Sequence, residues 1–148
     1  MNLRNDSQLP WTSSAALLTL RLAAGAVFVY HGWGKVFGEH GVDGFAGFLG
    51  SLGVPLPAVS AWLAALTELL GGLALLAGVG VRLVSVPLGF TMLVAILTVH
   101  RSGFDVAQGG MEFAMTMLAV TIALGLAGGG HFSLEQLLRK SPAPVLAR

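Results

Sequence analysis

The stretch RLAAGAVFVYHGWGK, residues 21–35, decides the fold of this chain. It is apolar enough for a membrane-spanning helix, yet it contains three ionisable side chains, Arg21, His31 and Lys35. A charge near the centre of a bilayer costs at least about 2.5–3.5 kcal/mol, so such groups usually face the inside of a helix bundle and find partners there. We therefore expect a membrane bundle whose functional information lies in its buried polar groups.

The composition of the whole chain agrees with a membrane protein. Of its 148 residues, 55% are hydrophobic and only 10% are charged, whereas soluble domains have roughly 25% charged residues. The chain has no cysteine, which excludes a disulfide, a thiol relay and a Cys-ligated metal. Electrons of any redox reaction must therefore travel through a bound cofactor, a quinone-like substrate or a partner. A net charge of +1, without a run rich in Lys or Arg, disfavours nucleic acid as a partner.

Four segments are long and apolar enough to span a membrane, which takes about 20 residues. The second and third are joined by the short turn GVGVR at residues 78–82, so we expect them to be antiparallel neighbours. The four expected spans are residues 14–36, 57–78, 81–99 and 111–127.

Two shorter helices are expected outside the spans. Residues 43–52 place Phe45, Phe48, Leu49 and Leu52 at i, i+3, i+4 and i+7, the pattern of one helical face. This segment predicts an interfacial helix between the first two spans. Residues 131–140 predict an amphipathic C-terminal helix capped by Ser133. The fold class is thus all-α, an integral membrane four-helix bundle in a single domain over residues 1–148, with tails at 1–13 and 131–148.

The distribution of basic residues predicts the orientation in the membrane. Cytoplasmic segments of membrane proteins carry an excess of Lys and Arg, which places both termini in the cytoplasm of a multi-pass protein of the cell (inner) membrane. The side with both termini has Arg4, Arg82, Arg139, Lys140 and Arg148, and the opposite side has Lys35 and Arg101.

Helix geometry sorts the buried charges by face. On the first span, residues 21, 25, 28, 32 and 35 form one stripe, and His31 lies about 40° from Lys35 at about 100° per residue. Glu68 on the second span and Glu112 on the fourth lie on faces rich in small residues, by which membrane helices pack closely. Both carboxylates are therefore expected to point inward.

Depth in the membrane sorts the same groups into two sets. Arg21 is about 10 Å and Glu68 about 15 Å from the cytoplasmic ends of their helices, at 1.5 Å per residue, which predicts a structural ion pair between them. His31, Lys35, His100 and Glu112 lie near the other end and predict a ligand-binding pocket. Two histidines and a carboxylate are suitable metal ligands. However, no H-x-x-x-H or E-x-x-H spacing occurs on one helix, so we expect no metal.

An ordered set of motifs resembles the DoxX family of small four-span membrane proteins. The motifs follow Arg21 and are HGWGK at 31–35, ELLGG at 68–72, HRSGF at 100–104, QGGME at 108–112 and GGGHFSLE at 128–135. The resemblance implies a membrane-embedded four-helix bundle. Members of this family include a subunit of a thiosulfate:quinone oxidoreductase and a component of membrane oxidoreductase complexes that handle thiol stress.

Three functions are compatible with these observations. The first is a quinone-binding subunit of a membrane oxidoreductase, in which His31 or His100 donates a hydrogen bond to a quinone carbonyl, Lys35 stabilises negative charge and Glu112 relays protons. The second is a non-catalytic scaffold or assembly partner, and the third is a small transporter or proton path. We favour the first because the polar residues gather at one depth. No residue is assigned as catalytic, and the expected partners are the lipid bilayer, a soluble or membrane redox protein, and a second copy of the chain.

Overall fold

The computed structural model describes residues 11–140, with side chains up to residue 138. Residues 1–10 and 141–148, which belong to the two expected tails, lie outside the described part. The long helices are α1 (Trp11–Phe37), α3 (Pro57–Ala77), α4 (Val81–Thr98) and α5 (Glu112–Ala127), and the short ones are α2 (Gly41–Ser51), η1 (Val106–Gln108) and α6 (Leu134–Lys140).

The all-helical membrane fold is confirmed. Helices α1, α3 and α4 are long and apolar enough to cross a bilayer, and α5 is a shorter apolar helix of 16 residues. Every end of these four helices lies within three residues of its predicted position. The interfacial and C-terminal helices are also present, as α2 and α6.

Helix α1 packs mainly on α3, and glycines set the closeness of this contact. A Cβ atom on Gly72 of α3 would lie 2.8 Å from the backbone nitrogen of Val29 and 2.9 Å from the carbonyl oxygen of Gly25. A Cβ on Gly32 would collide with the backbone of Leu69. Lipid is as apolar as these side chains, so the helices associate through this close backbone packing rather than through the hydrophobic effect.

Helix α5 packs mainly on α4, and the tight turn from α3 to α4 joins the two helix pairs. Gly78 and Gly80 in this turn have φ angles of +71° and +55°, which glycine adopts without steric cost. The apolar core lies where the pairs meet. Its most buried large side chains are Phe28, Leu75, Leu88 and Leu124, each at most 1% exposed.

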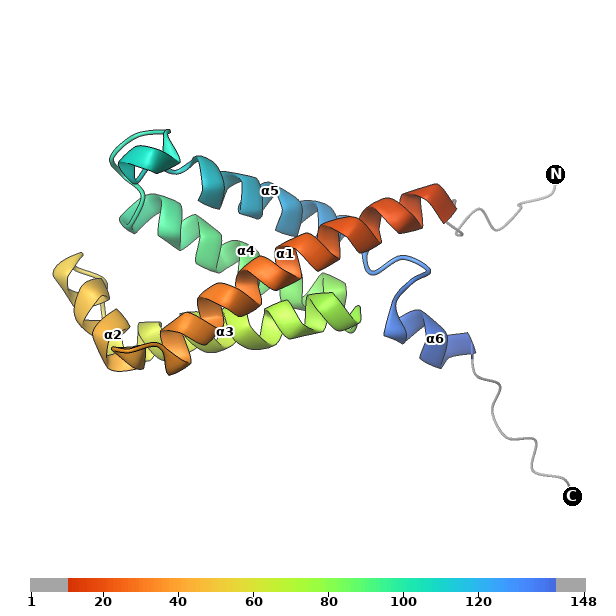
Figure 1. The fold of residues 1–148 in the computed structure, drawn as a ribbon, viewed down its shortest axis with the longest axis horizontal. Helices are drawn as coiled ribbons and strands as arrows, with labels where there is room; N and C mark the ends of the chain where they lie inside the picture. The colour runs from red at the N-terminus through yellow and green to blue at the C-terminus, as the bar shows by residue number, and fades with distance from the viewer. Residues whose placement is uncertain (1–10, 141–148) are drawn as a thin grey trace, which may run out of the picture.

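The two ends of the bundle differ (Figure 1). Helix α2 and the loop containing η1 lie at one end, which we call the α2 end. The start of α1, the α3–α4 turn and α6 lie at the other, which we call the α6 end.

Candidate functional site

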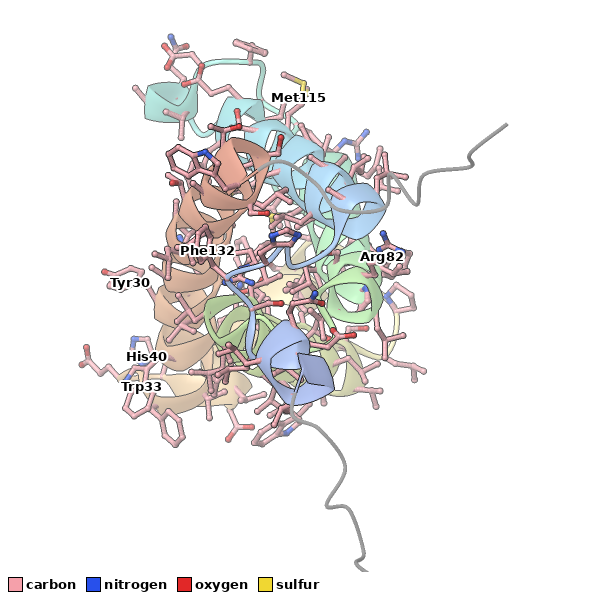
Figure 2. The ribbon with its side chains drawn as sticks, turned by 90° about the vertical axis from the view of Figure 1, so that its right-hand side faces the viewer. Tyr30, Trp33, His40, Arg82, Met115 and Phe132 are labelled. Carbon is pink, nitrogen blue, oxygen red and sulfur yellow. The ribbon has the colours of Figure 1, made fainter. Side chains whose placement is uncertain are left out.

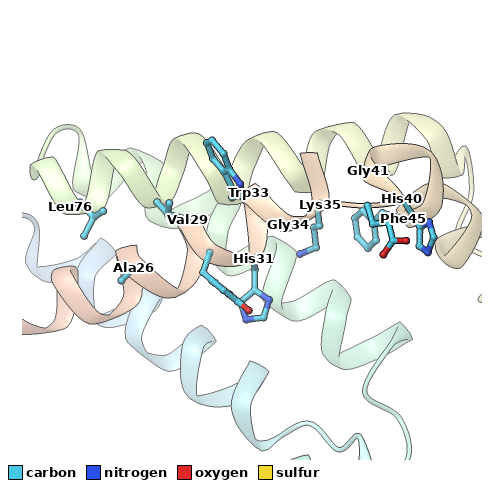
Figure 3. Close-up of a pocket in the computed structure, with 12 residues that line it drawn as sticks. Ala26, Val29, His31, Trp33, Gly34, Lys35, His40, Gly41, Phe45 and Leu76 are labelled. Atoms are coloured by element: carbon cyan, nitrogen blue, oxygen red, sulfur yellow. The ribbon is translucent and has the colours of Figure 1, made fainter. Parts of the chain in front are cut away.

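A groove with a cavity volume of about 870 Å³ follows α1 towards the α2 end (Figure 3). We call it the α1 groove. Its lining combines apolar residues with three aromatic rings, those of Tyr30, Trp33 and Phe45. Four ionisable residues complete this polar and aromatic set, namely His31, Lys35, Glu39 and His40. The groove lies on an outer side of the molecule, where Figure 2 shows Tyr30, Trp33 and His40 together, opposite Arg82.

Lys35, which lines the groove, forms an ion pair with Glu68. The Glu68 side chain is only 4% exposed, and that of Lys35 is 23% exposed. The Lys35 ammonium also lies 5.1 Å from the centre of the Phe45 ring, a cation–π contact with α2. Lys35 lines the groove, whereas Glu68 is buried in the bundle. The negative charge of the Glu68 carboxylate therefore neutralises the positive charge of Lys35 from inside the bundle.

The predicted ion pair between Arg21 and Glu68 is wrong. Within residues 11–140, Glu68 pairs with Lys35 instead, and the Arg21 guanidinium lies against Gly78. The prediction measured depth from both helix ends as if those ends were level. In the structure, the start of α1 extends beyond the end of α3. Arg21 therefore lies beside Gly78, which is ten residues, or about 15 Å, along the chain direction of α3 from Glu68.

Arg21 instead holds the segment 128–135 across the α6 end. Arg21 is 1% exposed, and its guanidinium donates hydrogen bonds to the carbonyl oxygens of Gly129 at 2.7 Å and Phe132 at 3.0 Å. The buried hydroxyl of Ser14 accepts a hydrogen bond from the backbone N–H of His131. These contacts explain why the motif GGGHFSLE lies beneath the start of α1.

Glu135 and Ser133 fix the far part of that segment. The Glu135 carboxylate accepts a hydrogen bond from the backbone N–H of Gly80 at 3.3 Å. The Ser133 hydroxyl accepts one from the N–H of Gln136, which confirms the expected helix cap. The segment therefore ties α6 to the α3–α4 turn.

His100 and Glu112 shape the loop between α4 and α5 and do not line the α1 groove. The Nδ1 atom of His100 lies 3.2 Å from the carbonyl oxygen of Gly109. The Glu112 carboxylate accepts a hydrogen bond from the backbone N–H of Val106 at 2.9 Å. The structure thus brings His31 and Lys35 to one groove, and leaves His100 in the α4–α5 loop and Glu112 at the start of α5, bonded to that loop.

His31 lies between the groove and the second helix pair. Its ring centre is 5.5 Å from that of Tyr30 and 6.1 Å from that of Phe113 at the start of α5. In Figure 3 its side chain points to the side of α1 opposite to Trp33. Within the described residues, no three His, Asp or Glu side chains come close enough together to hold a metal ion.

Most of the lining residues did not emerge as site candidates from the sequence, and Tyr30, Gly34 and Phe45 show why. Tyr30 and Gly34 lie among apolar residues of a spanning helix, where a side that lines a groove has the same composition as a side that faces lipid. Phe45 belongs to the expected interfacial helix, but its contact with Lys35 depends on how α2 folds back, which no spacing within α1 indicates.

Comparison with known proteins gives matches along most of the chain. A family model described as DoxX matches residues 16–101. The protein "Putative oxidoreductase CatD" of Bacillus subtilis (strain 168) is 34% identical over 124 residues, which cover 83% of this chain and 87% of that protein. "Inner membrane protein YqjF" of Escherichia coli (strain K12) is 32% identical over 127 residues, which cover 84% of this chain and 92% of that protein. No solved structure is significantly similar.

Proposed function

This chain belongs to the DoxX family of membrane proteins, and from that premise we propose that it is the quinone-binding component of a membrane oxidoreductase. The proposed site is the α1 groove. The observation that carries the proposal is the placement of His31 and Lys35 in one aromatic-walled groove, with Glu68 behind the lysine.

The chemistry of the lining supports a quinone as the substrate. Small-molecule sites are mostly apolar and aromatic, with a few polar groups that orient the ligand. His31 can donate a hydrogen bond to one carbonyl oxygen, and the Lys35 ammonium can stabilise negative charge on the reduced ring. Reduction to a hydroquinone adds two electrons and two protons. The electrons come from a redox partner, since the chain has no cysteine through which to pass them, and the two protons come from water at the α2 end of the groove.

The arrangement of polar groups favours a binding site over a transport path. Arg21 and Lys35 are 14 residues apart on α1, about 21 Å along the helix axis. Between these two levels the core contains Phe28, Leu75 and Leu88, all at most 1% exposed. A proton path requires polar groups or water along its whole length, and this apolar layer interrupts it.

Quenching of tryptophan fluorescence tests the proposal in lipid nanodiscs. One variant keeps only Trp33 (Trp11→Phe and Trp62→Phe), and its control keeps only Trp62 (Trp11→Phe and Trp33→Phe). Trp62 is 49% exposed on α3 near the same end of the bundle but is not among the described residues that line the groove. With ubiquinone-1 as the probe, we expect saturable quenching of Trp33 only.

Substitutions in this assay separate the two sets of predicted ligand residues. His31→Ala should weaken the binding by up to about tenfold, the equivalent of one ligand hydrogen bond. His100→Ala should leave it unchanged, because His100 contacts the loop. Equal and non-saturating quenching of Trp33 and Trp62 would mean that the quinone is only dissolved in the bilayer, and would leave the scaffold as the better function.

We also propose that both termini are cytoplasmic, with the α2 end on the opposite side of the membrane. The absence of native cysteines makes a labelling test unambiguous. Ser102 and Val79 are exposed at opposite ends of the bundle. In right-side-out vesicles, an impermeant maleimide should label Ser102→Cys directly and Val79→Cys only after permeabilisation, and the reverse pattern would invert the topology.

A further inference from the structure

The α1 groove extends beyond the ionisable residues into a wholly apolar section. At the α2 end its lining includes Lys35 and His40, whereas at its other end it consists of Ala26 and Val29 of α1 and Leu76 of α3 (Figure 3). Leu76 is held there by its packing against Gly25, where an added Cβ would lie 2.8 Å from the Leu76 side chain. Ala26 and Lys35 are nine residues apart, about 13 Å along α1. The groove therefore changes from polar to apolar along the direction that crosses the bilayer.

Gly34 leaves space in the polar section of the groove, next to Lys35. A glycine inside a helix costs about 0.5–1 kcal/mol relative to alanine, and packing against α3 explains the other two glycines of α1, Gly25 and Gly32. A Cβ on Gly34 would meet no atom within 4 Å. Gly34 lines the groove, so its missing side chain provides space for a ligand and not for a neighbouring helix.

The groove is also accessible from the lipid. The side chains of Tyr30 and Trp33 that line it are 76% and 58% exposed, and Ala26 and Gly34 are exposed as well. These residues belong to a membrane-spanning helix, so their exposed sides face acyl chains. A ligand that is itself dissolved in the bilayer can therefore enter sideways.

We infer that the α1 groove is a two-part site for a tail-bearing quinone, with the ring beside His31 and Lys35 and the isoprenoid tail running along α1 past Tyr30 to Ala26, Val29 and Leu76. This inference rests on the proposed function and names the substrate class for it. The apolar section takes the tail because it presents only aliphatic atoms. The tail gains no hydrophobic energy by leaving the acyl chains, so the section contributes dispersion contacts and a modest gain in affinity.

A comparison of quinones with and without a tail tests the inference. In the Trp33-only protein, ubiquinone-2 should bind about fivefold or more tightly than tail-less ubiquinone-0, with both concentrations expressed per lipid to correct for partitioning. Ala26→Phe fills the apolar section about 13 Å along α1 from Lys35, so it should abolish this difference and leave the affinity for ubiquinone-0 unchanged. Ala23→Phe is the matched control, an exposed alanine of α1 that is not among the described lining residues, and should change neither affinity.

Val29→Ala is a milder change in the apolar section in case Ala26→Phe affects folding, and it should reduce the preference for ubiquinone-2. Gly34 provides a further pair of variants, which tests the polar section. Gly34→Ala should fold and bind both quinones, whereas Gly34→Phe should reduce the binding of both at least tenfold by filling the space for the ring. Equal affinities for the two quinones, together with no effect of Ala26→Phe or Val29→Ala, would overturn the tail section and leave the proposed function standing. Failure of both quinones to bind would refute the proposed function and this inference with it.

Discussion

Replacing Lys35 by methionine is expected to lower the free energy of unfolding by about 3–5 kcal/mol, the usual cost of leaving one partner of a buried ion pair alone. The partner left behind is the Glu68 carboxylate, whose side chain is only 4% exposed. Glu68→Gln should cost less, because the remaining lysine is 23% exposed and its long side chain can extend towards water. The two single substitutions are thus expected to differ in size although they break the same contact.

A double-mutant cycle measures this coupling directly. The single variants and the double variant Lys35→Met/Glu68→Gln are unfolded by titration with SDS in mixed micelles, with helicity followed by circular dichroism. The double variant should recover most of the stability, because neither charge is then left in the bundle. Arg101→Gln, at an exposed position in the α4–α5 loop, is the control and should stay within about 0.5 kcal/mol of the unsubstituted protein. Strictly additive single effects would show that the two side chains do not interact.

Two glycines in one turn of α1 are expected to respond to alanine with opposite signs. Gly32→Ala should destabilise the protein by at least about 1–3 kcal/mol, because the new methyl group collides with the backbone of Leu69, which cannot move away as a flexible side chain would. Gly34→Ala should stabilise it by about 0.5–1 kcal/mol, since the methyl group meets open space and reduces the freedom of the unfolded chain.

The same SDS titration distinguishes the two glycines, and each serves as the control for the other. Gly32→Ala should also weaken the Lys35–Glu68 pair, because the wider spacing of α1 and α3 moves these side chains apart. A neutral effect of Gly32→Ala would mean that the two helices cross at a greater distance than the structure has them.

Hydropathy and periodicity were sufficient to predict the helices, because membrane spans depend on local composition and length. The four long helices and α2 appear close to the predicted bounds. The cap on α6 also followed from local chemistry, since Ser133 and Gln136 are only three residues apart. Predictions that depended on one segment alone were therefore successful.

Predictions that depended on the register between helices were less successful. The face of Glu68 was predicted as inward, and the residue is indeed buried, but its partner was not identified. The partner of Glu68 depends on how far α1 extends beyond the end of α3. The composition of the individual helices does not indicate this offset. The carbonyl partners of Arg21 were also beyond prediction, because Gly129 and Phe132 approach it from a segment more than 100 residues away.

Photo-crosslinking with a tail-bearing azidoquinone in lipid nanodiscs, followed by mass spectrometry of the labelled peptides, tests most directly whether the α1 groove binds a quinone. A quinone bound in the α1 groove should label residues in the segment 26–45, and this labelling should be suppressed by an excess of ubiquinone-2 and reduced in the His31→Ala and Gly34→Phe variants. Labelling confined to the α4–α5 loop around His100 and Glu112, or labelling along all helices that ubiquinone-2 does not suppress, would contradict binding in this groove.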